Sequence, residues 1–216
     1  MERRTIAGFE AAILGLGTSR LASMGAGRSR ADAQRLFNVA RDCGINFLDT
    51  ADTYGSTAAE RWTGELTAQD THRWIVTTKT GLPTVDLPGP FRVVNQPAKK
   101  LKQALRNEYV LDPKRLRRRI ERSLNRLRRE RIEIFLLHLP PSTIVNEKET
   151  WEALQSAQKS GLIAEFGVSS DDLNLIRGVH GAWGSTCVET AVNPSSAAGK
   201  TPGALVDFEV IANHVM

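Results

Sequence analysis

The chain has 216 residues, of which 41% are hydrophobic and 25% are charged, and its formal net charge is +5. This length and composition indicate a globular protein with one large domain and exclude an intrinsically disordered chain. The modest positive charge does not by itself require a nucleic acid or an anionic lipid as partner. No apolar run approaches the ~18 residues that a membrane-spanning helix needs, so we expect no membrane association.

The cysteines and the start of the chain bear on its location. Cys43 and Cys187 are the only cysteines and both stand in apolar contexts, so we expect two buried thiols in a reducing compartment. Met1-Glu2-Arg3-Arg4 precedes a short apolar stretch that Glu10 interrupts, which does not fit a signal peptide. We therefore expect a cytoplasmic protein.

Short apolar, β-branched runs alternate with longer amphipathic stretches. The predicted strands are Ala12–Gly17, Ile45–Leu48, Trp74–Thr78, Ile132–Leu137, Ala164–Val168, Cys187–Val192 and Val206–Ala212. The helix signals between them are a capping box at Ser29 and Asp32, a second at Thr57 and Glu60, a cap and N1 proline at Asp112-Pro113, apolar residues at Trp151 and Leu154, and a cap within Ser170-Asp171-Asp172.

This alternation, without hairpin signals, predicts an α/β protein with parallel strands and crossover helices. Both a doubly wound sheet and a (β/α)₈ TIM barrel fit. A dinucleotide-binding doubly wound sheet should carry G-x-G-x-x-G, but Gly15-Leu16-Gly17 is followed by Thr18-Ser19-Arg20, which lacks the third glycine and favours the barrel. Only seven strands are predicted, so we expect residues 1–216 to form a single barrel domain that lacks its last strand.

Polar residues follow the predicted strands. Asp49, Lys79 and His138 stand at the carboxyl ends of the second, third and fourth strands, and Tyr54 follows Asp49 by five residues. In a parallel barrel all of these strand ends lie on one face, where the chemistry of such folds occurs. Each residue alone is commonly structural, and it is the joint pattern that predicts a site.

Four sequence motifs, in their order along the chain, resemble those of the aldo-keto reductase superfamily. The resemblance extends over roughly Leu14 to Pro194. The motifs are Gly44-Ile45-Asn46-Phe47-Leu48-Asp49-Thr50-Ala51-Asp52-Thr53-Tyr54-Gly55, Thr78-Lys79, Leu136-Leu137-His138 and Phe166-Gly167-Val168-Ser169-Ser170. The resemblance implies a (β/α)₈ barrel that binds a nicotinamide cofactor without a Rossmann motif and reduces aldehydes or ketones. NADP(H) is the usual cofactor of the family, and NAD(H) stays open.

The resemblance also implies roles for particular residues. Tyr54 would be the general acid, Lys79 and Asp49 its supporting pair, and His138 the residue that orients the carbonyl. The expected cofactor-binding residues are Gly17, Thr18, Asp49, Ser169, Ser170 and Glu189.

The chemistry of these groups is consistent with those roles. Hydride transfer to a carbonyl leaves an alkoxide that needs a proton, and a free tyrosine has a pKa of ~10. A lysine ammonium ~4 Å away is worth about 4 kcal/mol at an effective dielectric constant of ~20. We therefore expect Lys79 to bring the pKa of Tyr54 towards neutrality and Asp49 to keep Lys79 charged.

The sequence also departs from the family pattern. Ser170 stands where the family commonly has Asn, Glu189 where it commonly has Gln, and Asn213 where it often has an aromatic residue. The eighth strand and the segment that selects between NADPH and NADH have no counterpart, which is the reason the cofactor stays open.

Two stretches have functional and purely structural interpretations. The segment Gly81–Asn107 contains four prolines and a basic group at Lys99, Lys100, Lys102 and Arg106, and it is either a lid over the site or a surface insertion without a role. Lys114 to Arg131 holds ten basic residues, but its leucine stripe and lack of aromatic residues favour an outer barrel helix over a nucleic-acid site.

Three functions remain open at this stage. A carbonyl reductase acting on a small molecule is the leading hypothesis, a non-catalytic member of the same fold that binds cofactor or a protein partner is the second, and a nucleic-acid-binding module is the third. His72, His138, His180 and His214 show no ligand spacing with cysteines or carboxylates, so no metal site is expected. The substrate and the oligomeric state are not predicted.

Overall fold

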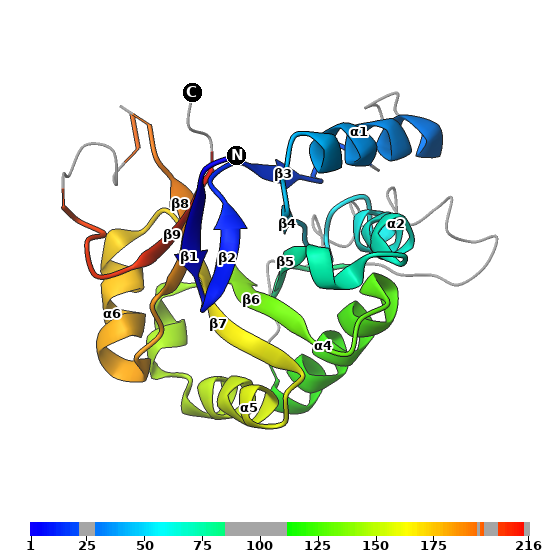
Figure 1. Ribbon diagram of the computed structural model, residues 1–216. Helices are drawn as coiled ribbons and strands as arrows, with labels where there is room; N and C mark the ends of the chain where they lie inside the picture. The colour runs from blue at the N-terminus through cyan, green and yellow to red at the C-terminus, as the bar shows by residue number, and fades with distance from the viewer. Residues whose placement is uncertain (22–28, 85–111, 194, 197–202, 214–216) are drawn as a thin grey trace.

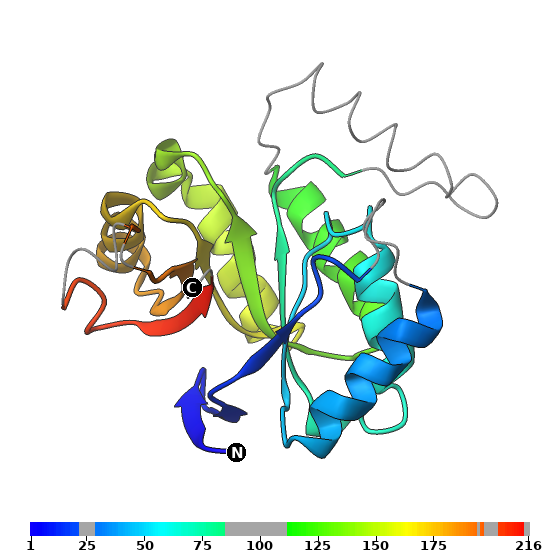
Figure 2. The ribbon, with the colours of Figure 1, turned by 90° about the horizontal axis from the view of Figure 1, so that it is seen from above.

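The computed structural model describes residues 1–21, 29–84, 112–193, 195–196 and 203–213. Seven parallel strands form one sheet in the order β3-β4-β5-β6-β7-β8-β9, and a separate antiparallel pair precedes them. The sheet is curled, with the helices on its outer side (Figures 1 and 2). The predicted α/β architecture, an incomplete (β/α)₈ barrel, is confirmed.

Consecutive strands of the sheet are joined by crossover segments, as parallel pairing demands. The seven strands are β3 (Gly15–Gly17), β4 (Phe47–Asp49), β5 (Ile75–Thr80), β6 (Ile132–His138), β7 (Ile163–Ser169), β8 (Cys187–Ala191) and β9 (Glu209–Asn213). Among the described residues the α-helices are α1 (Arg30–Asp42), α2 (Ala58–Thr67), α4 (Pro113–Leu127), α5 (Lys148–Lys159) and α6 (Leu173–Trp183), with short 3₁₀ turns η1 (Thr71–Arg73) and η3 (Ser142–Asn146).

An N-terminal hairpin is the main element that the sequence analysis did not predict. β1 (Arg3–Ile6) pairs antiparallel with β2 (Phe9–Ala12) through a turn at Ala7 and Gly8, which both have positive φ. That geometry is the tight hairpin turn whose twist matches the strands. The Ala7 amide donates to Glu209 at 2.6 Å, and Asn46, just before β4, accepts from the Ala12 amide at 2.7 Å. The hairpin therefore covers the amino ends of the parallel strands (Figures 1 and 2).

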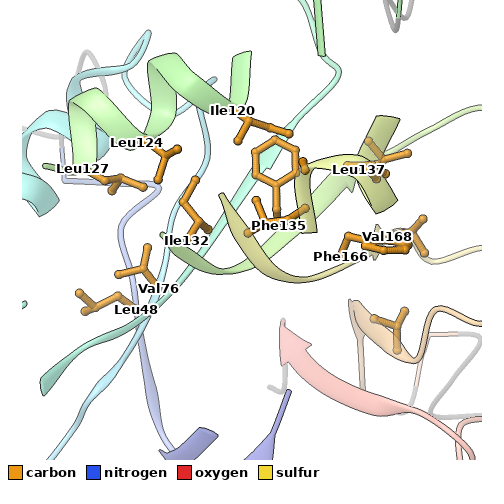
Figure 3. Close-up of a cluster of buried hydrophobic side chains, with 14 of the residues drawn as sticks. Leu48, Val76, Ile120, Leu124, Leu127, Ile132, Phe135, Leu137, Phe166 and Val168 are labelled. Atoms are coloured by element: carbon orange, nitrogen blue, oxygen red, sulfur yellow. The ribbon is translucent and has the colours of Figure 1, made fainter. Parts of the chain in front are cut away.

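Side chains alternate between the two faces of the curled sheet. On β6, Phe135 and Leu137 pack outward against the helices, whereas Ile134 and Leu136 belong to a smaller cluster inside the barrel. Figure 3 shows the outer cluster, where Ile120 of α4 lies against Phe135. Because the period of a strand is two, His138 shares the inward face with Ile134 and Leu136.

The helix ends test the predicted caps. The Ser29–Asp32 capping box, the Asp112 cap with Pro113 behind it and the Asp172 cap are all present. The Thr57–Glu60 box is wrong, because Thr57 adopts a left-handed backbone conformation (φ 73°) and its side chain caps nothing.

Other expectations have mixed outcomes. Cys187 is buried as expected, but Cys43 is exposed, because it follows the last residue of α1 on the solvent side. Within the described residues no helix is long and apolar enough to cross a membrane. Most of the proline-rich and basic segment at 81–107, including its four cations, lies outside the described residues, as does His214.

Candidate active site

Five ionisable side chains meet at the carboxyl ends of the strands. Asp49 ends β4, Lys79 lies near the end of β5, His138 ends β6, and Glu189 lies on β8. Tyr54 follows β4 in a loop whose backbone is hydrogen-bonded to β5: the Thr50 amide donates to the Thr77 carbonyl and the Asp52 amide donates to the Lys79 carbonyl. The structure therefore brings together all four residues that the sequence analysis proposed as catalytic.

Lys79 lies at the centre of this group. Its side chain is fully buried, and its ammonium pairs with Asp49, lies 2.9 Å from the Glu189 carboxylate and donates to the Thr50 carbonyl at 3.1 Å. Burial alone would lower the pKa of Lys79, but the two carboxylates outweigh it and raise that pKa. Lys79 is therefore a fixed cation at the floor of the site.

Asp49 has an unusually basic carboxyl group. Its pKa is raised to about 7: burial is the main cause, the charge of Glu189 adds to the rise, and the field of Lys79 opposes it. The Asp49 carboxyl group is therefore partly protonated near neutral pH.

Tyr54 and His138 form the accessible part of the site. Their rings meet edge to face with centroids 6.0 Å apart, and the Lys79 ammonium lies 5.3 Å from the centre of the Tyr54 ring. Both side chains are partly exposed, whereas Lys79 is not. A small molecule at this rim can therefore contact the phenol and the imidazole but not the ammonium.

The field at Tyr54 differs from the sequence-based expectation. Burial raises the pKa of Tyr54, Lys79 lowers it, and Asp49 and Glu189 raise it, so that the net pKa is raised. The expectation that Lys79 brings this pKa towards neutrality is wrong for the chain as it stands. Burial of the phenol is the largest cause of the rise, and the charges of Asp49 and Glu189 add to it, so that together they outweigh Lys79.

A buried network behind the site was not found from the sequence. The Asp52 carboxylate accepts from Thr80 at 2.6 Å and from Arg119 of α4 at 3.3 Å, and Arg119 also donates to Thr80 at 2.9 Å and to the Leu82 carbonyl at 3.2 Å. Despite Arg119, burial raises the pKa of Asp52 to about 6. The network fixes the loop that carries Tyr54 to the end of the strand that carries Lys79.

A second buried pair supports the same elements. Glu60 of α2 accepts from Thr78 of β5 at 2.7 Å and from Arg126 of α4 at 2.6 Å. Glu60 was proposed as part of a helix cap, but its carboxylate instead joins a strand to two helices. The strand position next to Lys79 is therefore held from the outer side of the sheet.

Backbone strain lies beside the two accessible residues. Ser56 and Thr57, shortly after Tyr54, and Leu139, directly after His138, have positive φ angles of 52°, 73° and 49°. Such conformations cost of the order of 1 kcal/mol each and cluster at functional sites. The strain shows that both turns are held by the surrounding structure.

The residues proposed to bind the cofactor lie around this rim, and they differ in how accessible they are to another molecule. Gly17 pairs in register with Asp49 and has open space where a side chain would be, so another molecule can approach its backbone. Thr18 is fully buried, and both its amide and its hydroxyl donate to the Asp49 carbonyl. Thr18 therefore holds the backbone of Asp49 in place. Ser169 ends β7 beside His138, in register with Glu189.

The remaining two positions are more constrained. Ser170 follows β7 and its hydroxyl accepts from the Asp172 amide at 3.2 Å. Glu189 is 3% exposed, and its second oxygen accepts from Asn213 of β9 at 2.9 Å. Asn213 stands where the family often has an aromatic residue, and here it donates a hydrogen bond to the Glu189 carboxylate. Across the described parts of the chain, no group of three or more His, Cys, Asp or Glu side chains could hold a metal ion.

Comparison with known proteins identifies the family. The model of the Aldo/keto reductase family matches residues 13–200, and the chain therefore belongs to that family. It is 33% identical over 153 residues to the 6-dehydroglucose reductase of Novosphingobium aromaticivorans, covering 67% of this chain and 43% of that protein. It is 29% identical over 175 residues to the aldo-keto reductase YhdN of Bacillus subtilis, covering 79% of this chain and 47% of that protein.

Solved structures agree on the fold. The aldo-keto reductase AKR11C1 from Bacillus halodurans, in its holo form, superposes with a TM-score of 0.74 at 21% identity, over 98% of this chain and 65% of that one. The chain spans less than half the length of the two curated relatives. The family and the fold are therefore established, and the activity of this chain is a matter for proposal.

Proposed function

We propose that this chain is an NAD(P)H-dependent oxidoreductase that reduces an aldehyde or ketone at the rim formed by Tyr54 and His138. The observation that carries the proposal is the placement of the Lys79 ammonium 5.3 Å from the Tyr54 ring, with His138 at the ring's edge. Named reductases among the relatives support the same class of reaction.

Tyr54 is the proton donor in this proposal. Its raised pKa keeps the phenol protonated at neutral pH, so it can donate to an oxygen that becomes negative. Lys79 stabilises the tyrosinate left behind, whereas burial and the charges of Asp49 and Glu189 oppose that ionisation.

His138 orients the carbonyl group. Its ring meets the Tyr54 ring edge to face with centroids 6.0 Å apart, a separation at which one small molecule can lie against both side chains. A carbonyl oxygen there can accept from both, which aims two donors at the atom on which negative charge develops.

The residues present fit the nicotinamide end of the cofactor. A reduced nicotinamide would supply the hydride to the carbonyl carbon when bound. Ser169 and Ser170 offer hydroxyl groups to its carboxamide, and the open face of Gly17 allows a flat ring to approach the sheet. Each oxygen of Glu189 can accept a further hydrogen bond beside its present partner, and Asp49 lines the same floor.

The test is turnover with a proton-donor variant. We expect NADPH or NADH to bind, as followed by cofactor fluorescence. We also expect at least one member of a panel of aldehydes and ketones to be reduced, with oxidation of the bound cofactor. Tyr54→Phe should slow reduction by about 10²- to 10⁴-fold, because general acid catalysis contributes that much, while cofactor binding is largely retained.

Tyr109→Phe is the matched control, since Tyr109 is the only other tyrosine, and it should leave turnover unchanged. Near-normal turnover in Tyr54→Phe would remove Tyr54 as the donor. Cofactor binding without turnover on any carbonyl would favour the second candidate, a cofactor-binding member of the family without catalytic activity.

A further inference from the structure

Glu189 has an environment that a cofactor contact alone does not explain. Its side chain is 3% exposed, one oxygen lies 2.9 Å from the Lys79 ammonium, and the other accepts from Asn213 at 2.9 Å. A buried carboxylate is tolerated only beside a cation. Lys79, however, is already paired with Asp49, which makes Glu189 a second counter-ion of the same ammonium.

The carboxylates that face this ammonium come from two strands, β4 and β8. β4 contributes Asp49 and β8 contributes Glu189, while β7 and β9 contribute the uncharged Ser169 and Asn213. The loop after β4 and the end of β6 contribute the titratable Tyr54 and His138. With both carboxylates ionised, the buried group has a net charge of minus one.

This net charge acts on the phenol. Lys79 lowers the pKa of Tyr54, whereas burial and each of the two carboxylates raise it, and the result is a raised pKa. Removing Glu189 would leave one ammonium and one carboxylate, whose opposite fields largely cancel. The ionisation of Tyr54 would then become easier.

We propose that Glu189 holds Tyr54 in its protonated, proton-donating form: as second counter-ion of Lys79 it places a further negative charge near the phenol, which opposes ionisation of the phenol. In reduction the Oη–H bond of Tyr54 breaks and an O–H bond forms on the product, while a hydride from the reduced nicotinamide bonds to the carbonyl carbon and the nicotinamide is oxidised. The inference rests on the proposed function of this site.

The direct test is an ultraviolet titration of tyrosinate in the cofactor-free protein. The chain has two tyrosines, so in a Tyr109→Phe background the signal reports Tyr54 alone. We expect its midpoint at or above the ordinary tyrosine value of ~10, and a lower midpoint when Glu189→Gln is added. Glu165→Gln is the matched control, since Glu165 lies on β7 and makes no described contact with Lys79, and it should leave the midpoint in place.

A second readout is the pH profile of carbonyl reduction. Because the reaction needs protonated Tyr54, its rate should fall as the pH rises through the Tyr54 midpoint. In Glu189→Gln this fall should move to lower pH, whereas a merely structural role would lower the rate without moving it.

Several results would overturn the proposal. One is a Tyr54 midpoint below that of free tyrosine in the Tyr109→Phe protein, which needs no Glu189 variant to fold. Another is a folded Glu189→Gln protein, as judged by circular dichroism, whose midpoint is unchanged or raised. A lowered midpoint in a protein that turns over no carbonyl would refute the proposed function and leave the electrostatic effect of Glu189 intact.

Discussion

Arg119→Met should destabilise the folded chain and loosen the loop that carries Tyr54. Arg119 supplies the ion pair to Asp52 and two further hydrogen bonds, to Thr80 and to the Leu82 carbonyl. The Asp52 side chain is 4% exposed and that of Arg119 is 20% exposed. Removing one partner of a buried pair costs 3–5 kcal/mol, and the partial exposure of Arg119 places the expected loss near the lower limit, at about 3 kcal/mol.

The loss should also depend on pH in a defined sense. The pKa of Asp52 is about 6 with Arg119 present, and without the guanidinium it rises further. Below about pH 6 the carboxyl group is protonated in both proteins and no longer needs the cation. The difference in stability between Arg119→Met and the parent chain should therefore shrink as the pH falls through this range.

Urea unfolding followed by tryptophan fluorescence, at a pH above and a pH below 6, measures both effects. Arg122→Met is the matched control, because Arg122 lies on the exposed face of the same helix and its loss should cost less than about 0.5 kcal/mol. The reasoning fails if Arg119→Met is no less stable than Arg122→Met, or if its cost stays constant across this pH range.

Three further variants test other parts of the structure. Asp52→Asn should flatten the pH dependence of stability. The pKa of Asp52 is about 6 in the folded chain and 3.8 in the unfolded chain. The free energy of unfolding of the parent chain therefore falls by about 3 kcal/mol as the pH rises between these values. Lys79→Met should lower the free energy of unfolding by about 3–5 kcal/mol at neutral pH, because two buried carboxylates lose their cation; a loss below 1 kcal/mol in urea unfolding would contradict this. Gly64→Ala should cost about 1–3 kcal/mol, because its Cβ would collide with the α4 backbone, whereas Gly181→Ala has open space and should be neutral or stabilising; equal unfolding midpoints would contradict this.

The sequence could predict that these side chains lie together because two simple rules act together. Asp49, Lys79 and His138 end parallel strands, and parallel strands place their carboxyl ends on one face. The alternation of Ile134, Leu136 and His138 then directs the polar ends inward. The same rules do not predict the position of Tyr54, because it lies in a loop with a strained backbone conformation. Only the resemblance to the family motif pointed to Tyr54.

The supporting charges could not be predicted in this way. Arg119 and Asp52 are 67 positions apart, and Arg126 and Glu60 are 66 apart. In the sequence, Arg119 and Arg126 resemble the many solvated arginines of α4. Only the packing of α4 against α2 shows which of these arginines face inward. The cap proposed at Thr57 failed for a related reason, since the tight turn after Tyr54 dictates the Thr57 backbone before the helix begins.

The pKa of Tyr54 shifts in the direction opposite to the sequence-based expectation. A phenol beside a lysine with one aspartate as counter-ion suggests a lowered pKa, but that expectation included neither the burial of the phenol nor the charge of Glu189. Because Lys79 reaches across the barrel interior from β5 to β8, Glu189 lies within 2.9 Å of it. A strand end opposite a buried lysine is therefore a position where a glutamine and a glutamate have different electrostatic consequences.

Isotope transfer tests the central claim most directly. The chain would be incubated with an aldehyde and with NADPH or NADH that carries deuterium on the reactive ring carbon, and the alcohol product would be examined by mass spectrometry. The account predicts deuterium on the alcohol carbon, with transfer suppressed in Tyr54→Phe and preserved in Tyr109→Phe. A cofactor-saturated protein that transfers no deuterium to any aldehyde or ketone, or a Tyr54→Phe protein that transfers it at the parent rate, would contradict the account.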